Sequence, residues 1–147
     1  MIFVFGGAYQ GKRDFVKENL GIKEEDILNV PNLCDYIDIK NDQDLYYSLE
    51  EIINTSGKTA SCVYGLETFI RVALLSGRPV DKWLEDWLSV PEGDKRIIIM
   101  NDMSQGLVPM DAEDREYREA CGRAMIKLSK AAEEVYRVFC GLGQRIK

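Results

Sequence analysis

A glycine-rich loop that ends in lysine is the part of this sequence best suited to chemistry. The loop reads Gly6-Gly-Ala-Tyr-Gln-Gly11-Lys12 and follows directly after an apolar run, residues 1–5. Glycines accept positive φ, so successive backbone N–H groups can turn toward one anion while the lysine reaches its outer phosphates. The residues expected to bind the phosphates of a nucleotide are Gly6, Gly7, Ala8, Tyr9, Gln10, Gly11, Lys12 and Arg13.

Arg13 is where this loop departs from the phosphate-binding pattern G-x-x-x-x-G-K-[ST]. The Ser or Thr hydroxyl at that position normally holds Mg²⁺ against the phosphates, whereas a guanidinium only donates and cannot coordinate a cation. Two interpretations of Arg13 stay open: a surface arginine without a role, and a cation that pairs with phosphate. The sequence therefore supports nucleotide binding better than nucleotide chemistry. It leaves undecided whether Mg²⁺ binds and which residues would hold a metal ion.

Composition narrows the class of protein. The 147 residues are 46% apolar and 30% charged, which fits a single domain, residues 1–147. A net charge of -6 argues against a nucleic-acid partner, because affinity for a phosphate backbone comes from clustered Lys and Arg. The sequence contains no His, which excludes histidine base catalysis and phosphohistidine chemistry.

We expect neither a targeting signal nor a cysteine-based metal site in this sequence. The N-terminal apolar run stops at Phe5 and has no basic flank, so we expect no signal peptide, no membrane partner and a cytoplasmic protein. The four cysteines are widely spaced and include no C-x-x-C pair, so we expect buried thiols at Cys34, Cys62, Cys121 and Cys140.

Apolar runs of strand length alternate with segments of helical spacing. The expected strands are residues 1–5, 27–30, 60–64, 96–100 and 134–139, and the expected helices are 14–20, 45–54, 66–75, 80–88 and 111–132. This alternation predicts an α/β three-layer sandwich with a mostly parallel central sheet, whose ligands bind at the carboxyl ends of the strands. Segments 6–12, 64–67 and 101–109 all lie at such ends, so we expect them to converge on one cleft.

Helix boundaries and faces follow from particular residues. Gly21, Gly57 and Gly77 are expected to end helices, and Pro31 to stop a strand. The helix 111–132 should bury one stripe of side chains: Tyr117, Ala120, Cys121, Ala124, Leu128 and Ala131. Trp83 and Trp87 are expected in the core or on an oligomer face rather than on a ligand, and the acids of segment 35–44 in a solvated loop.

Several motifs in the C-terminal half resemble one known family. They are Asn101-Asp-Met-Ser-Gln-Gly106-Leu-Val-Pro109, Arg115-Glu-Tyr-Arg118-Glu119, Gly122-Arg123 and the run 134–147. Together with the loop of residues 6–12, they resemble the adenosylcobinamide kinase and adenosylcobinamide-phosphate guanylyltransferase family of cobalamin assembly. The resemblance implies a P-loop NTPase-like fold, ATP or GTP as the nucleotide, a corrinoid substrate and a homo-oligomer.

Two departures from that family restrict the implied chemistry. The span between Arg13 and Arg71 has no Arg and no His, so the histidine that accepts GMP in the family is missing. Tyr64 stands where the family's strand-end Asp is expected. Glu67 and Asp102 remain as carboxylates near the expected cleft, where either can take the proton of a substrate hydroxyl or hold a metal.

Two functions follow from these residues and the resemblance. In the first, the protein is a phosphotransferase that phosphorylates the side-chain hydroxyl of adenosylcobinamide without histidine-mediated guanylyl transfer. Its catalytic residues would be Lys12 on the β and γ phosphates, with Asp102 or Glu67 on the hydroxyl. In the alternative, it is a catalytically reduced paralogue that binds nucleotide or corrinoid without turning it over.

Overall fold

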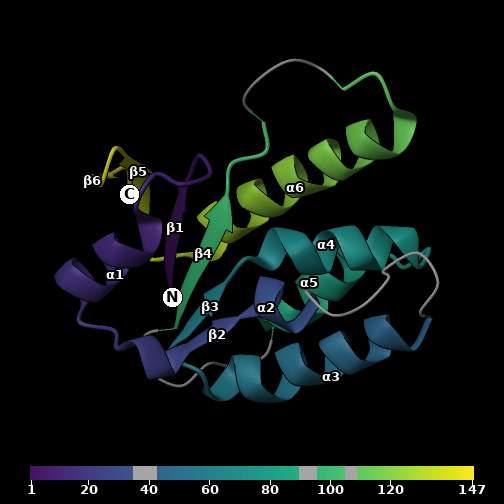
Figure 1. The fold of residues 1–147 in the computed structure, drawn as a ribbon, viewed down its shortest axis with the longest axis horizontal. Helices are drawn as coiled ribbons and strands as arrows, with labels where there is room; N and C mark the ends of the chain where they lie inside the picture. Colours follow the sequence, from purple (N-terminus) through teal and green to yellow (C-terminus); the bar gives the residue numbers. More distant parts are fainter. Residues whose placement is uncertain (35–42, 90–95, 105–108) are drawn as a thin grey trace.

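A six-stranded sheet forms the centre of the molecule (Figure 1). The computed structural model describes residues 1–34, 43–89, 96–104 and 109–147. The strand order is β2-β3-β4-β1-β5-β6; the first five strands are parallel, and β6 is antiparallel to β5. The strands are β1 (Ile2–Gly6), β2 (Ile27–Asn29), β3 (Cys62–Tyr64), β4 (Ile97–Asn101), β5 (Glu134–Phe139) and β6 (Leu142–Arg145).

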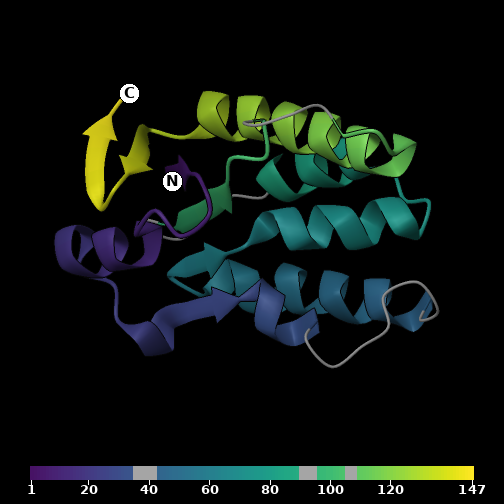
Figure 2. The same ribbon diagram turned by 45° about the horizontal axis from the view of Figure 1, so that its top comes forward.

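Helices cover both faces of this sheet unequally. They are α1 (Lys12–Leu20), α2 (Val30–Cys34), α3 (Gln43–Thr59), α4 (Leu66–Leu75), α5 (Val80–Ser89) and α6 (Ala112–Ala131), with a short 3₁₀ turn η1 (Glu24–Asp26). The four long helices α3 to α6 lie together on one side, and α1 lies on the other (Figures 1 and 2). The structure thus confirms the predicted three-layer α/β sandwich.

Alternation along the strands divides the core between these two layers. Phe3 and Ile98 pack with the four-helix layer, whereas their neighbours Val4 and Ile99 pack with Phe15 and Val16 of α1. Buried on both faces, such strands read as continuous apolar runs, which is why β1 and β4 were the clearest strands in the sequence.

Three predicted boundaries were wrong for local reasons. Pro31 does not stop a strand: β2 ends at Asn29 and Val30 starts α2, since the fixed φ of proline suits a first helical turn. Helix α3 continues beyond Gly57 to Thr59, because one glycine costs a helix only about 1 kcal/mol. In α6 the buried stripe ends at Leu128: Ala131 is exposed, and Ala132, the residue that follows the helix, is buried instead.

Other predicted helix ends are confirmed. Gly21 follows α1 with φ 71°, and Gly77 lies in the turn after α4 with φ 66°, both in the left-handed region that favours glycine. Asp111 caps α6, and its carboxylate accepts hydrogen bonds from the backbone N–H groups of Glu113 and Asp114.

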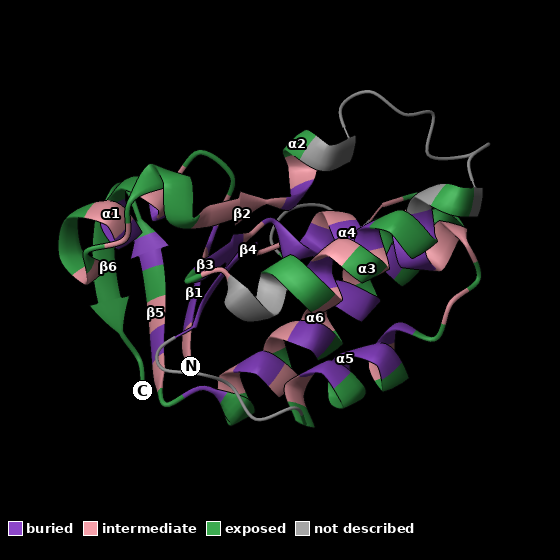
Figure 3. Cartoon of the chain, turned by 90° about the horizontal axis from the view of Figure 1, so that it is seen from below, coloured by how far each residue is buried: buried purple, intermediate pink, exposed green. Residues whose placement is uncertain are grey.

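Strand β6 was not predicted. It forms a hairpin with β5 through Cys140 and Gly141, whose φ values of 51° and 78° suit a two-residue turn with both residues left-handed. The strand is exposed along its whole length (Figure 3). Because Cys140 lies at the tip of this hairpin, its thiol is exposed and the prediction of burial was wrong there; Cys62 and Cys121 are buried as predicted.

The two tryptophans of α5 belong to the core. Trp83 and Trp87 keep 8% and 2% of their surface exposed, and their rings stack with centroids 5.4 Å apart. The guanidinium of Arg96 lies 3.9 Å from the Trp87 ring, and burial lowers the pKa of Arg96 to about 10. The pair is therefore internal, and it gives no support to the predicted homo-oligomer.

Two further expectations can be compared with the structure only over the residues that it describes. The acidic segment 35–44 lies outside them except for its last two residues, which begin α3. Among the helices of the described ranges, none combines the length and the apolar composition that a membrane span requires.

Candidate functional site

A cavity lies at the carboxyl ends of β1 and β4, where the helices that follow these neighbouring strands lie on opposite faces of the sheet. Strand β1 leads into α1 on one face and its neighbour β4 leads toward α6 on the other, so their carboxyl ends open between the two layers (Figure 1). A cavity of about 560 Å³ lies there, within the usual range for small-molecule sites. It is lined by Ala8, Tyr9, Gln10, Gly11, Lys12, Arg13, Asp14, Pro31, Tyr64, Glu67, Thr68 and Asn101.

The glycine-rich loop has the backbone of an anion site. Tyr9 and Gly11 adopt φ values of 58° and 82°, and alternation of this kind is how concave arrays of N–H groups are built. The loop is fastened to the β5–β6 hairpin: Gln10 accepts hydrogen bonds on its backbone oxygen from Gly141 N at 2.9 Å and on its Oε1 from Cys140 N at 2.7 Å. The unpredicted hairpin thus supports the predicted loop.

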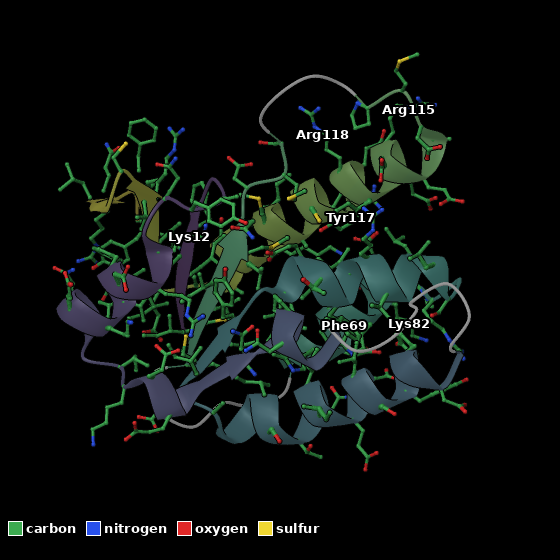
Figure 4. All side chains as sticks on the ribbon, viewed as in Figure 1. Lys12, Phe69, Lys82, Arg115, Tyr117 and Arg118 are labelled. Carbon is green, nitrogen blue, oxygen red and sulfur yellow. The ribbon has the colours of Figure 1, made fainter. Side chains whose placement is uncertain are left out.

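Lys12 is buried at the start of α1, with 4% of its surface exposed (Figure 4). Its Nζ donates hydrogen bonds to Gly7 O and to Asn101 Oδ1, each at 2.6 Å. Burial lowers the pKa of Lys12, and the nearby Glu67 carboxylate partly opposes that shift. Lys12 therefore lines the cavity as a positioned cation with little competition from water.

Glu67, from the first turn of α4, faces the same cavity and is also only 4% exposed. Its carboxylate accepts hydrogen bonds from both the backbone N–H and the side-chain amide of Asn101. Burial raises the pKa of Glu67, while the Asn101 hydrogen bonds and the Lys12 charge oppose the shift. Asn101 thus bridges a buried ammonium and a buried carboxylate.

We expect Asn101→Ala to destabilise the protein in a pH-dependent way. The change removes the side-chain hydrogen bond to the Glu67 carboxylate and the Oδ1 acceptor of Lys12, whereas the backbone N–H of residue 101 and Gly7 O remain as partners. Each buried hydrogen bond lost in this way should cost about 1 to 3 kcal/mol. The folded-state pKa of Glu67, already raised, should rise further. A raised carboxylate pKa means that stability is lost as pH rises from the unfolded value toward the folded one.

The deficit of Asn101→Ala should therefore grow in urea unfolding series as pH rises above the wild-type folded-state pKa of Glu67, which lies above the ordinary glutamate value of 4.5. Asn19→Ala is the matched control, because the side-chain amide of Asn19 also donates a hydrogen bond, in this case to Phe15 O outside the cavity. A pH-independent deficit equal to that of the control would contradict the bridge.

Arg13 and Tyr64 stand together at one wall of the cavity. The Arg13 guanidinium lies over the Tyr64 ring, 5.2 Å from its centroid, and forms an ion pair with Glu24. Burial raises the pKa of Tyr64, so its phenol is neutral at physiological pH. The prediction that segment 64–67 meets the loop is confirmed, with β3 and α4 supplying Tyr64 and Glu67.

The remaining predicted site residues, Gly6, Gly7 and Asp102, do not line the cavity. Gly6 ends β1 and Gly7 follows it; neither lines the cavity, although Gly7 O accepts a hydrogen bond from Lys12 Nζ. The Asp102 carboxylate accepts hydrogen bonds from the backbone N–H and hydroxyl of Ser104, and Asp102 is not a lining residue. Residues 105–108 of the expected segment 101–109 lie outside the described ranges.

Sequence reasoning assigned no role in the site to four lining residues, Asp14, Pro31, Thr68 and Asn101. Asn101 is the first residue of the motif 101–109, but its residue type alone does not predict that its side chain bridges two charged groups. Thr68 and Pro31 gave no signal of their own. Pro31 packs behind Gly65, which has φ 82° and where a Cβ would lie 2.3 Å from Pro31 Cδ. Close approach at this point brings α2 against the cavity.

Comparison with known proteins adds a family to this geometry. Residues 43–146, more than half of the chain, match the model of cobinamide kinase / cobinamide phosphate guanyltransferase. Two proteins named bifunctional adenosylcobalamin biosynthesis protein CobU, from Salmonella typhimurium (strain LT2) and Escherichia coli (strain K12), are each 36% identical over 53 residues. These matches cover 36% of this chain and 29% of either relative, so the similarity spans less than a third of their length.

The glycine-rich loop lies before the matched residues, so its assignment depends on its geometry. The matched part contains Tyr64, Glu67 and Asn101, which complete the cavity from the other side. Matched and unmatched parts together form the P-loop NTPase-like α/β fold that the family resemblance implied. The chain belongs to the cobinamide kinase / cobinamide phosphate guanyltransferase family.

Proposed function

We propose that this protein binds a nucleoside triphosphate, ATP or GTP, and transfers its γ-phosphoryl group to the side-chain hydroxyl of adenosylcobinamide in cobalamin metabolism. The products would be the nucleoside diphosphate and the phosphate ester. The observation that carries the proposal is the Asn101 bridge, which presents a buried ammonium and a buried carboxylate to one cavity of about 560 Å³.

Lys12 and the loop amides would hold the β and γ phosphates. Phosphoryl transfer needs little covalent help from a protein, so positioning and charge stabilisation supply most of the catalysis. Lys12 would have to exchange Gly7 O or Asn101 Oδ1 for phosphate oxygens, which is favourable because an ionised acceptor makes a stronger hydrogen bond than a carbonyl.

Glu67 is the better placed of the two candidate bases. It lines the cavity, and its raised pKa makes the carboxylate a stronger acceptor for the proton of the attacking hydroxyl. Asp102 does not line the cavity, and its carboxylate accepts hydrogen bonds from Ser104. We therefore assign the proton-accepting role to Glu67 and keep Asp102 as the alternative.

The second candidate function is nucleotide or corrinoid binding without turnover. It is favoured by the contact between Arg13 and Tyr64, which occupy the positions where the family pattern has a metal-binding hydroxyl and a carboxylate. Such a protein would keep the phosphate loop and lose the reaction.

A transfer assay separates the two functions. Protein is incubated with γ-³²P-labelled ATP or GTP and adenosylcobinamide, and labelled corrinoid is measured. The proposal expects label in the corrinoid and a loss of roughly 10²-fold or more in rate for Glu67→Gln, the usual effect of removing a general base. Nucleotide binding without any labelled corrinoid would favour the second function.

Guanylyl transfer through the protein should be absent. Incubation with GTP labelled at the α-phosphate should leave no acid-labile label on the chain, because the whole sequence has no histidine to form a phosphoramidate. Precipitated protein is counted before and after mild acid treatment. Stoichiometric label lost in acid would contradict this prediction and would require a lysine such as Lys12 as the acceptor.

A further inference from the structure

Arg13 and Tyr64 occupy the two positions where the family pattern has magnesium-binding side chains, and they contact each other. Arg13 follows the loop lysine directly, Tyr64 ends β3, and the guanidinium lies 5.2 Å from the centre of the tyrosine ring. Both line the cavity. A guanidinium has no lone pair for a cation, and a neutral phenol is a poor ligand for Mg²⁺, which takes carboxylate and water oxygens.

The carboxylates nearest the cavity are already engaged. Glu67 accepts two hydrogen bonds from Asn101, and its pKa is raised by burial. Asp14 lies 3.1 Å from Lys17 Nζ. Asp102 accepts from Ser104. Across the described ranges, no group of three or more His, Cys, Asp or Glu side chains is arranged to hold a metal ion. These residues do not fit a magnesium site.

Arg13 brings positive charge to the place that the ion would occupy. It is two-thirds buried, its present anionic partner is Glu24, and Glu24 also pairs with Lys17 at 3.3 Å. Glu24 therefore keeps a cation when Arg13 turns toward a ligand. Lys12 and Arg13 would then face the phosphates from adjacent positions at the start of α1, where the helix end also favours an anion.

We propose that the cavity binds the polyphosphate group of a nucleotide in its metal-free form, with the Arg13 guanidinium, steadied on the Tyr64 ring, in place of Mg²⁺. The inference rests on the nucleotide-binding part of the proposed function and is independent of the transfer step. The physical reason is charge: a free triphosphate carries more negative charge than its magnesium complex, so two fixed cations favour the free form.

Isothermal titration calorimetry with ATP and GTP tests this directly, each in excess Mg²⁺ and in EDTA. We expect binding in EDTA to be at least as tight as in Mg²⁺. Binding that is tighter in Mg²⁺ by tenfold or more would overturn the inference while leaving the nucleotide site intact. No binding in either buffer would overturn the nucleotide site, and this inference with it.

Variants assign the effect to the pair. The double variant Arg13→Ser, Tyr64→Asp restores a hydroxyl and a carboxylate and removes one cation, so its affinity in Mg²⁺ should exceed that in EDTA by about tenfold or more. Arg13→Lys should keep the wild-type ratio because it keeps the charge, although its affinity should fall in both buffers, since an ammonium does not stack on the Tyr64 ring as a guanidinium does. Lys23→Ser is the matched control: it removes one exposed cation that pairs with Glu25, outside the cavity lining, and should leave the ratio unchanged.

Thermal unfolding in the absence of ligand shows whether each variant is folded before titration. A folded double variant with the same Mg²⁺-to-EDTA ratio as wild type would show that Arg13 and Tyr64 do not set the metal dependence. The same conclusion would follow if Lys23→Ser shifted the ratio as far as the double variant does.

Discussion

Replacing Lys12 with alanine should remove about half or more of the thermal protection that a nucleoside triphosphate or pyrophosphate gives to this protein. A ligand at 100 times its Kd stabilises the native state by about 2.7 kcal/mol. For a domain of this size each kcal/mol moves the midpoint by roughly 2 to 4 °C. Wild type should thus gain roughly 5 to 11 °C from triphosphate and much less from the nucleoside alone.

The loss follows from the position of Lys12 on the cavity wall. A hydrogen bond to a charged group is worth about 1.5 to 3 kcal/mol, so the variant should bind roughly 10- to 150-fold more weakly. At the same ligand concentration its protection falls to about 1.4 kcal/mol or less. Differential scanning fluorimetry at fixed ligand measures this.

Lys17→Ala is the matched control for Lys12→Ala. Lys17 carries the same charge on α1 but pairs with Asp14 and Glu24, and it does not line the cavity. Lys12→Met keeps more of the buried stem in place if the alanine variant is too unstable to measure. Equal protection of wild type and both Lys12 variants would mean that the loop has only a structural role.

Gly6→Ala should destabilise the protein strongly, whereas Gly122→Ala should stabilise it. A Cβ at Gly6 would lie 2.2 Å from the backbone oxygen of Val138 in β5, so β1 and β5 would have to separate. Overpacking against backbone at such a distance should cost more than about 3 kcal/mol, the upper end of the usual range. In unfolding by urea the midpoint should fall with the slope unchanged.

Gly122 lies within α6, and a Cβ there would meet nothing within 4 Å. Alanine should add about 0.5 to 1 kcal/mol through helix propensity alone. The same substitution therefore has opposite signs at the two sites. A Gly6→Ala protein as stable as wild type would show that the loop does not rest against β5 as described.

Local sequence carried enough information to predict the site's framework. The loop of residues 6–12, the strands β1 and β4 and the start of a helix at residue 111 are each determined by residues within a few positions, and each was predicted. The convergence of Tyr64 and Glu67 on Lys12 also followed, because parallel strands share one carboxyl edge.

The features that were missed depend on distant partners. The role of Asn101 exists only because Lys12 and Glu67 approach it from two other elements. Strand β6 lacks the alternation and β-branched residues of a typical strand, and its turn, Cys140-Gly141, is not among the common hairpin dipeptides. Tertiary contacts with β5 and with Gln10 place it, and none of them is visible locally.

Direct binding of a labelled nucleoside triphosphate to the wild-type protein tests the central claim, that the cavity beside Lys12 is a nucleotide phosphate site. Equilibrium dialysis is performed with and without Mg²⁺, and with unlabelled pyrophosphate or nucleoside as competitor. We predict saturable binding of one nucleotide per chain that pyrophosphate displaces and an equal concentration of nucleoside does not. The absence of saturable binding at millimolar nucleotide in both buffers would contradict the account.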